Sequence, residues 1–184
     1  MKVLVAFASR HGATQGIAER IASTLAAAGD DAAALPVRDA GNLDSYDAFV
    51  VGSAVYMFHW LKEATKFVRH NRTLLESRPL WLFSSGPLGT ETTDAKGRDP
   101  LEASEAREMA GFQEALQPRG HAMFYGAYAP GAAVGLGERF VAMIPAARKA
   151  MPEGDFRDWD VIDAWAAVIT EELAAEVRPN PPTP

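Results

Sequence analysis

Short apolar runs that alternate with helix-like segments constrain the fold of this chain more than any other feature. The runs are short and largely continuous in apolar residues, as is typical of strands buried on both faces of a sheet. They cover residues 3–8, 46–53, 80–83 and 121–126, with a weaker, alanine-rich candidate at 32–37. The chain should therefore contain five strands.

Helical spacing of apolar residues fills the intervals between these runs. Gly29 is a typical helix end, and Asp99 followed by Pro100 is a typical helix start. The predicted helices are 17–28, 60–75, 99–116, 140–151 and a last one from Trp159 that is capped by Asp158 or Asp160.

Strands that alternate with helices predict an α/β fold with a parallel sheet covered on both sides. For five strands in one domain of 1–176 we expect a doubly wound sheet in the order 2-1-3-4-5. The proline-rich tail, 177–184, should be disordered. Ligands of such sheets bind beyond the carboxyl ends of the strands, so the loops 9–14, 53–60 and 84–90 should form the site.

Composition excludes several classes of function. The chain has no cysteine, which excludes disulfide scaffolds, thiol catalysis and iron–sulfur clusters. Eighteen Lys+Arg against 24 Asp+Glu give a net charge of −6, which argues against nucleic acid as a partner. The apolar run at 3–8 is too short for a signal peptide or a membrane span, so we expect a cytoplasmic protein.

The loop between the first strand and the first helix has the composition of a site for a single phosphate. It offers two hydroxyls, a glycine, two cationic side chains and the amides of a helix start. These residues are Ser9, Arg10, His11, Gly12, Ala13 and Thr14. The alternative is that Ser9 and Thr14 only cap the helix. The loop lacks the further glycines of a dinucleotide site and the Gly-Lys-Ser/Thr of a nucleoside triphosphate loop.

Two further loops could hold a flat apolar ring. The candidates after the third strand are Ala54, Val55, Tyr56, Met57 and Trp60, with His59 as a weak candidate proton donor. Those after the next strand are Ser84, Ser85, Gly86, Pro87 and Leu88. Tyr56, Met57 and Trp60 are the stacking candidates, although Phe58 and Trp60 could instead begin the core face of the next helix. A serine with a histidine could also form a nucleophile and base, but no Gly-x-Ser-x-Gly elbow supports this.

The loop 9–14 and the strand before it also resemble a motif of a known protein family. Phe7–Thr14, followed by the alanine-rich helix, resembles the FMN-phosphate loop of the flavodoxin-like superfamily. Arg10 and the segment Gly154–Trp159 are similar to the menaquinone-dependent protoporphyrinogen dehydrogenase branch, in which His59 also has a counterpart. The resemblance implies FMN as the cofactor, a flavodoxin-like fold and a Gly126-Ala127 pair on the substrate side. His11, Tyr56 and Phe58 depart from the residues of that branch.

Three function classes follow from this resemblance. The first is an FMN-dependent oxidoreductase that passes electrons between an organic substrate and a quinone. The second is an electron carrier that serves a redox protein. The third, a phosphoacceptor receiver, fails because Ser9 and Gly52-Ser53 occupy the positions that need carboxylates.

The segment 131–152 should distinguish the two remaining classes. In the dehydrogenase branch this insert is long, basic and aromatic, as suits a membrane face. Here it is only weakly amphipathic. We expect it to pack on the sheet or to contribute to a homodimer, with peripheral contact at the inner membrane face as the alternative.

Overall fold

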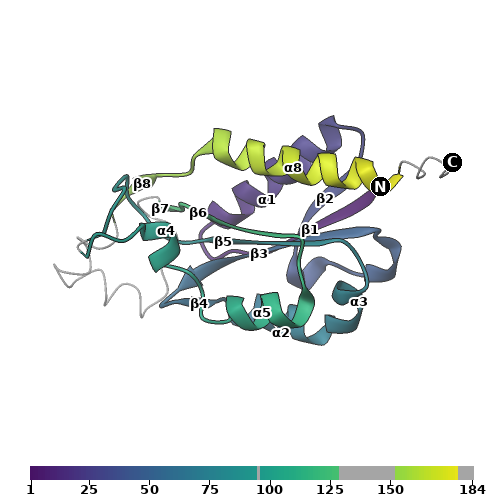
Figure 1. Ribbon diagram of the computed structural model, residues 1–184, viewed down its shortest axis with the longest axis horizontal. Helices are drawn as coiled ribbons and strands as arrows, with labels where there is room; N and C mark the ends of the chain where they lie inside the picture. Colours follow the sequence, from purple (N-terminus) through teal and green to yellow (C-terminus); the bar gives the residue numbers. More distant parts are fainter. Residues whose placement is uncertain (95, 129–151, 178–184) are drawn as a thin grey trace, which may run out of the picture.

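The computed structural model describes residues 1–94, 96–128 and 152–177 of the 184. These residues form a parallel sheet with helices on both faces and a short antiparallel ribbon at one end (Figure 1). The strands are β1 (Lys2–Ala8), β2 (Asp31–Pro36), β3 (Ala48–Tyr56), β4 (His59–Trp60), β5 (Leu80–Ser85), β6 (Gly120–Phe124), β7 (Ala127–Tyr128) and β8 (Gly154–Asp155). The helices are α1 (Ala13–Ala27), α2 (Lys62–His70), α3 (Arg72–Glu76), α4 (Pro100–Ala103), α5 (Met109–Leu116) and α8 (Trp159–Val177), with single 3-10 turns η1 (Val37–Asp39) and η2 (Leu43–Ser45).

The strand order confirms the predicted topology. The five parallel strands lie in the order β2-β1-β3-β5-β6, which is 2-1-3-4-5 when they are counted along the chain. β4 adds a short antiparallel partner to the end of β3, and β7 pairs with β8 in a separate ribbon. The chain therefore reverses its winding direction between β1 and β3, where a doubly wound sheet places its ligand site.

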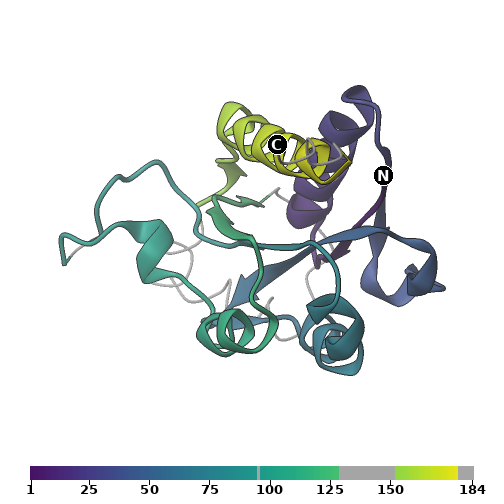
Figure 2. The same cartoon turned by 45° about the vertical axis from the view of Figure 1, so that its right-hand side comes forward.

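Alternation along the strands divides the core into two layers. In β1, Val3, Val5 and Phe7 face α1 and α8, whereas Leu4 and Ala6 face the opposite side, where α2, α3 and α5 pack. Figure 2 shows α1 and α8 side by side over one face of the sheet, with α2, α3 and α5 beneath the other face. A strand buried on both faces needs apolar residues at every position, which explains the continuous run in the sequence.

Two predicted helices are wrong in their extent. The segment 60–75 begins as β4, and its helical part is divided into α2 and α3 at Asn71. The segment 99–116 likewise consists of α4 and α5 with a turn between them. The predicted helix 140–151, with nearly all of the insert 131–152, and the tail beyond 177 lie outside the described residues.

The capping residues at two helix starts agree with the prediction from the sequence. Asp99 Oδ1 accepts a hydrogen bond from Leu101 N at the start of α4. Of the two candidate caps of the last helix, Asp158 is the cap, because its Oδ1 accepts from the amides of Asp160 and Val161. Within the described residues, no helix is long and apolar enough to cross a membrane.

Candidate functional site

A cavity of about 290 Å³ opens at the carboxyl ends of β1, β3 and β5. This is the edge of the sheet at which the topology predicts a ligand. Its lining consists of Ser9, His11, Ala13, Thr14, Ala54, Val55, Tyr56, Met57, Ser85, Gly86, Pro87, Leu88, Gly126, Ala127 and Tyr128. All but four of the cofactor-binding residues predicted from the sequence line it, and those four are Arg10, Gly12, Trp60 and Ser84.

The loop before α1 presents polar groups to one end of the cavity. Gly12 precedes the helix with a φ of 86°, a left-handed conformation that favours glycine. Its amide donates to Ser9 Oγ at 3.1 Å. The N-cap residue, Gly12, has no side chain with which to cap the helix, so Ser9 satisfies the amide just before the first turn of α1 and not an amide within it.

The Thr14 hydroxyl and the helix amides remain available to a ligand. Thr14 lines the cavity, is 1% exposed, and its hydroxyl makes no hydrogen bond to any other described residue. The first amides of a helix have no partner within the helix, and the helix dipole makes its start electropositive. The loop therefore offers a hydroxyl and several amides in a field that favours an anion.

Three residues with rings line the cavity: His11, Tyr56 and Tyr128. The His11 ring lies between two tyrosines, with centroid distances of 6.4 Å to Tyr56 and 6.3 Å to Tyr128. The Arg10 guanidinium does not line the cavity but lies 4.7 Å from the centroid of the Tyr56 ring. Tyr56 and Tyr128 thus supply aromatic surface from two different strand ends, which suits a flat apolar ligand.

The rim next to Tyr56 is a two-residue hairpin between β3 and β4. Met57 and Phe58 have φ values of 51° and 63°, a left-handed conformation that asparagine and glycine adopt far more readily. Their side chains are 86% and 51% exposed. Tyr56 pairs with His59 across the turn. The hairpin therefore presents apolar side chains to solvent beside the cavity.

Contacts with the segment before α5 hold this hairpin in place. The Phe58 carbonyl accepts from Arg107 N at 2.9 Å, and His59 Nδ1 lies 2.7 Å from Glu108 Oε1. Burial alone would raise the pKa of Glu108, but hydrogen bonds from the His59 ring and from backbone amides lower it overall. His59 thus stabilises the hairpin and does not line the cavity. This argues against His59 as a proton donor to a ligand in the cavity.

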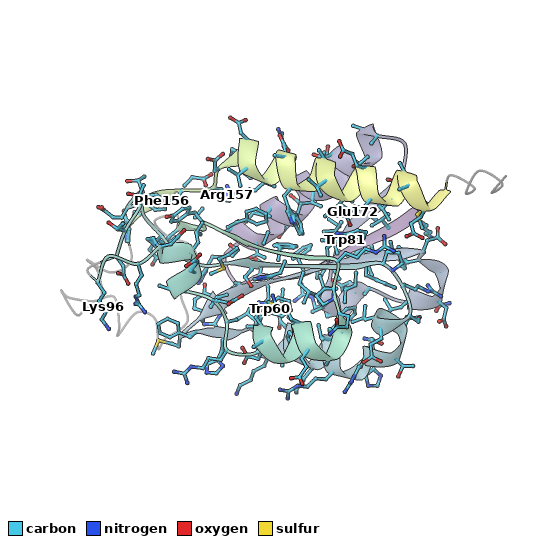
Figure 3. All side chains as sticks on the ribbon, viewed as in Figure 1. Trp60, Trp81, Lys96, Phe156, Arg157 and Glu172 are labelled. Carbon is cyan, nitrogen blue, oxygen red and sulfur yellow. The ribbon has the colours of Figure 1, made fainter. Side chains whose placement is uncertain are left out.

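Trp60 and Ser84 belong to the core rather than to the cavity. Trp60 is 3% exposed, packs at 5.4 Å from the Phe112 ring, and donates from Nε1 to Ser84 Oγ at 2.8 Å. Figure 3 shows Trp60 on the side of the sheet that α5 covers. Trp60 therefore packs in the core and does not line the cavity, but it does so from β4, and Phe58 is exposed, so neither residue begins the core face of a helix.

Ser84 also takes part in a serine–histidine–glutamate arrangement. Its Oγ lies 3.4 Å from His121 Nε2, and His121 Nδ1 lies 3.3 Å from Glu105 Oε1. Burial lowers the pKa of His121 to about 4. Because Ser84 is fully buried and already bonded to Trp60, no substrate carbonyl can reach its hydroxyl, and we assign it no nucleophilic role.

The segment 154–157 supports the walls of the cavity from outside. β8 pairs with β7, and Phe156 N donates to the Gly126 carbonyl at 3.1 Å. Arg157 reaches α1 and donates from Nη1 to the Ala13 carbonyl at 3.3 Å. The sequence pattern singles out this segment but gives no sign of its contact with the first loop, because the two lie more than 140 positions apart.

Comparisons with known proteins agree with the fold. A family model described as flavodoxin domain matches residues 4–139. The structure is similar to that of a mutant flavodoxin from Pseudomonas aeruginosa, with a TM-score of 0.58, 17% identity, and coverage of 95% of this chain and 99% of that one. It is also similar to oxidised flavodoxin 1 from Bacillus cereus, with a TM-score of 0.52, 15% identity, and coverage of 97% and 100%.

A larger protein has a similar region. Rubredoxin oxygen:oxidoreductase from Desulfovibrio gigas matches with a TM-score of 0.61 and 13% identity, over 97% of this chain and 37% of that one. At these identities the likeness shows the fold alone. A search of curated proteins found no match.

Proposed function

The chain belongs to the flavodoxin domain family, and from this premise we propose that it is an FMN-dependent oxidoreductase. Membership of this family indicates FMN as the cofactor. We propose further that the protein passes electrons between an organic substrate and a quinone, as protoporphyrinogen dehydrogenases do. The observation that carries the proposal is one cavity with an anion-binding loop at one end and two tyrosines beside it.

The residues present fit FMN. Thr14 and the amides at the start of α1 would hold the phosphate, and the open space beside Gly12 leaves room for an anion near the backbone. Tyr56 and Tyr128 would contact the ring system, and Ser85 with Gly86 would face its polar edge. When bound, FMN supplies the redox chemistry, and the protein contributes binding, orientation and the surrounding field.

A specific observation favours an electron carrier as the second candidate. Met57 and Phe58 form an exposed apolar rim beside the cavity. Such a rim suits contact with the surface of a redox protein as well as with a quinone ring. The carrier needs no substrate of its own, so the two candidates differ in turnover rather than in cofactor.

Two measurements test the proposal. The purified protein should be yellow and release FMN rather than FAD, and a colourless protein that takes up no FMN at micromolar concentration would refute it. Without oxygen, the reduced protein is then mixed with menadione and the oxidised protein with protoporphyrinogen. Turnover with either compound supports the enzyme. An absence of turnover with both compounds supports the carrier.

Substitution of Thr14 tests the role of the loop. Because a hydrogen bond to a charged group contributes about 1.5–3 kcal/mol, Thr14→Ala should weaken FMN about 10- to 100-fold and riboflavin about twofold at most. Thr14→Ser should restore most of the FMN affinity. Thr65→Ala, on α2, is the matched control, because among the described residues the Thr65 hydroxyl bonds only to the Leu61 carbonyl at the start of its own helix. Equal losses for both flavins in Thr14→Ala would show that the hydroxyl does not touch a phosphate.

A further inference from the structure

Arg157 joins the segment just before α8 to the start of α1 through several contacts. Its Nε and Nη2 donate to the two carboxylate oxygens of Asp155 at 2.8 and 2.6 Å. Its guanidinium lies 4.4 Å from the centroid of the Trp159 ring, and Nη1 donates to the Ala13 carbonyl. The side chain is only 16% exposed. Figure 3 shows Arg157 beside Phe156, just ahead of α8.

Gly16 makes room for this guanidinium on the first turn of α1. A Cβ atom at Gly16 would overlap Nη1 of Arg157. Glycine inside a helix is unfavourable relative to alanine, so its presence here needs a reason. The reason that the structure offers is the close approach of Arg157, which an alanine would prevent.

The same segment also contacts a second part of the cavity lining. Asp155 pairs with Ala127 in the β7–β8 ribbon, and Phe156 N donates to Gly126. Gly126 and Ala127 line the cavity, as does Ala13, to which Arg157 donates. Residues 154–157 therefore contact the cavity lining at two places, Ala13 at the start of α1 and the Gly126-Ala127 segment.

The charge of Arg157 at the start of α1 favours a negatively charged ligand there. A cation near the start of a helix is unfavourable, because both it and the helix end are positive. Without a ligand, the carboxylate of Asp155 offsets the repulsion between the Arg157 guanidinium and the helix start. An anion bound at the start of α1 would lower it further, so the arrangement favours a charged ester over a neutral ligand.

We propose that Arg157 is a positioning residue that holds the first turn of α1 in the geometry that binds a phosphate monoester. This inference rests on the proposed function, since FMN is the monoester concerned. Arg157 acts through Ala13 and the helix start and makes no contact with the ligand itself. Its removal should therefore weaken FMN without an equal effect on riboflavin, which has the same ring system and no phosphate.

The test compares dissociation constants of FMN and riboflavin by quenching of flavin fluorescence. Residues that orient metal ligands from outside cost about 10-fold or more when they are lost, and we expect a similar effect here. Arg157→Ala should therefore weaken FMN binding about 10-fold and riboflavin binding about twofold. Arg20→Ala is the matched control, because Arg20 forms the same two-bond pair between α1 and Asp163 on α8 but does not line the cavity. It should leave the ratio of the two constants unchanged.

A second variant guards against a fold defect in Arg157→Ala. Gly16→Ala displaces only the guanidinium and favours the helix, so it should also lower the preference for FMN. The phosphorus NMR shift of bound FMN should move in both variants and not in Arg20→Ala. If the ratio of the FMN and riboflavin dissociation constants is unchanged in both variants, because neither affinity changes or because both fall equally, the inference is overturned and the proposed function stands. A wild-type protein that binds no flavin overturns the proposed function together with it.

Discussion

Mild acid should destabilise this protein through one histidine, His121. Its side chain is 12% exposed, and burial lowers its pKa from 6.5 to about 4 because the low-polarity surroundings disfavour the charged imidazole. Glu105 lies close enough to favour the charged form, but its side chain is 46% exposed and solvent screens its charge. Burial therefore decides the direction.

The size of the effect follows from the two pKa values. Between pH 6.5 and about 4, the unfolded chain binds a proton at this histidine that the folded chain does not. The stabilising contribution is complete above pH 6.5 and is lost as the pH falls toward 4. Linkage gives a loss of about 2 kcal/mol in the free energy of unfolding between about pH 7.5 and about pH 5.

Urea unfolding followed by tryptophan fluorescence measures this loss. The comparison is with His121→Gln, which keeps a polar side chain but cannot titrate. The carboxylates titrate in both proteins, so their contribution cancels in the difference. The wild type should lose about 2 kcal/mol more than the variant over the same range. Parallel pH profiles for the two proteins would refute the reasoning.

Two further predictions concern packing and a helix cap. A Cβ atom at Gly52 would overlap the buried Phe83 ring, so Gly52→Ala should lower the free energy of unfolding by about 3 kcal/mol in urea titrations. Adding Phe83→Leu should recover part of the loss, and a change under about 0.5 kcal/mol in the single variant would contradict the overlap. Asp158→Ala should cost about 1 kcal/mol by the same assay, because two amides of α8 lose their acceptor. Asp160→Ala is its control, and an equal loss there would contradict the assignment of the cap.

The fold was predictable because its signals are local and repeated. Continuous apolar runs such as 3–8 mark strands that are buried on both faces, and the helices between them require parallel pairing. The hairpin at Met57 and Phe58 was not predictable in the same way. It uses two non-glycine residues where such turns normally carry asparagine and glycine, and without it Trp60 reads as the start of a helix.

The site was predictable as a set of loops but not as a set of side chains. Ser84 and Ser85 are adjacent on one strand, so they face opposite sides of the sheet, and only Ser85 lines the cavity. The topology identifies the loop but does not select between the two serines. The contact of Arg157 with Ala13 has no local signal at all, since it depends on how α8 returns to α1.

The β7–β8 ribbon has a consequence for the architecture of the chain. Tyr128 and Gly154 pair directly, so the two ends of the stretch between them lie side by side. The entropy of closing a loop rises only slowly with its length, so a longer or shorter stretch between these paired ends should change the stability little. A change in that length is therefore expected to leave the β7–β8 ribbon, and with it the cavity wall at Ala127 and Tyr128, in place.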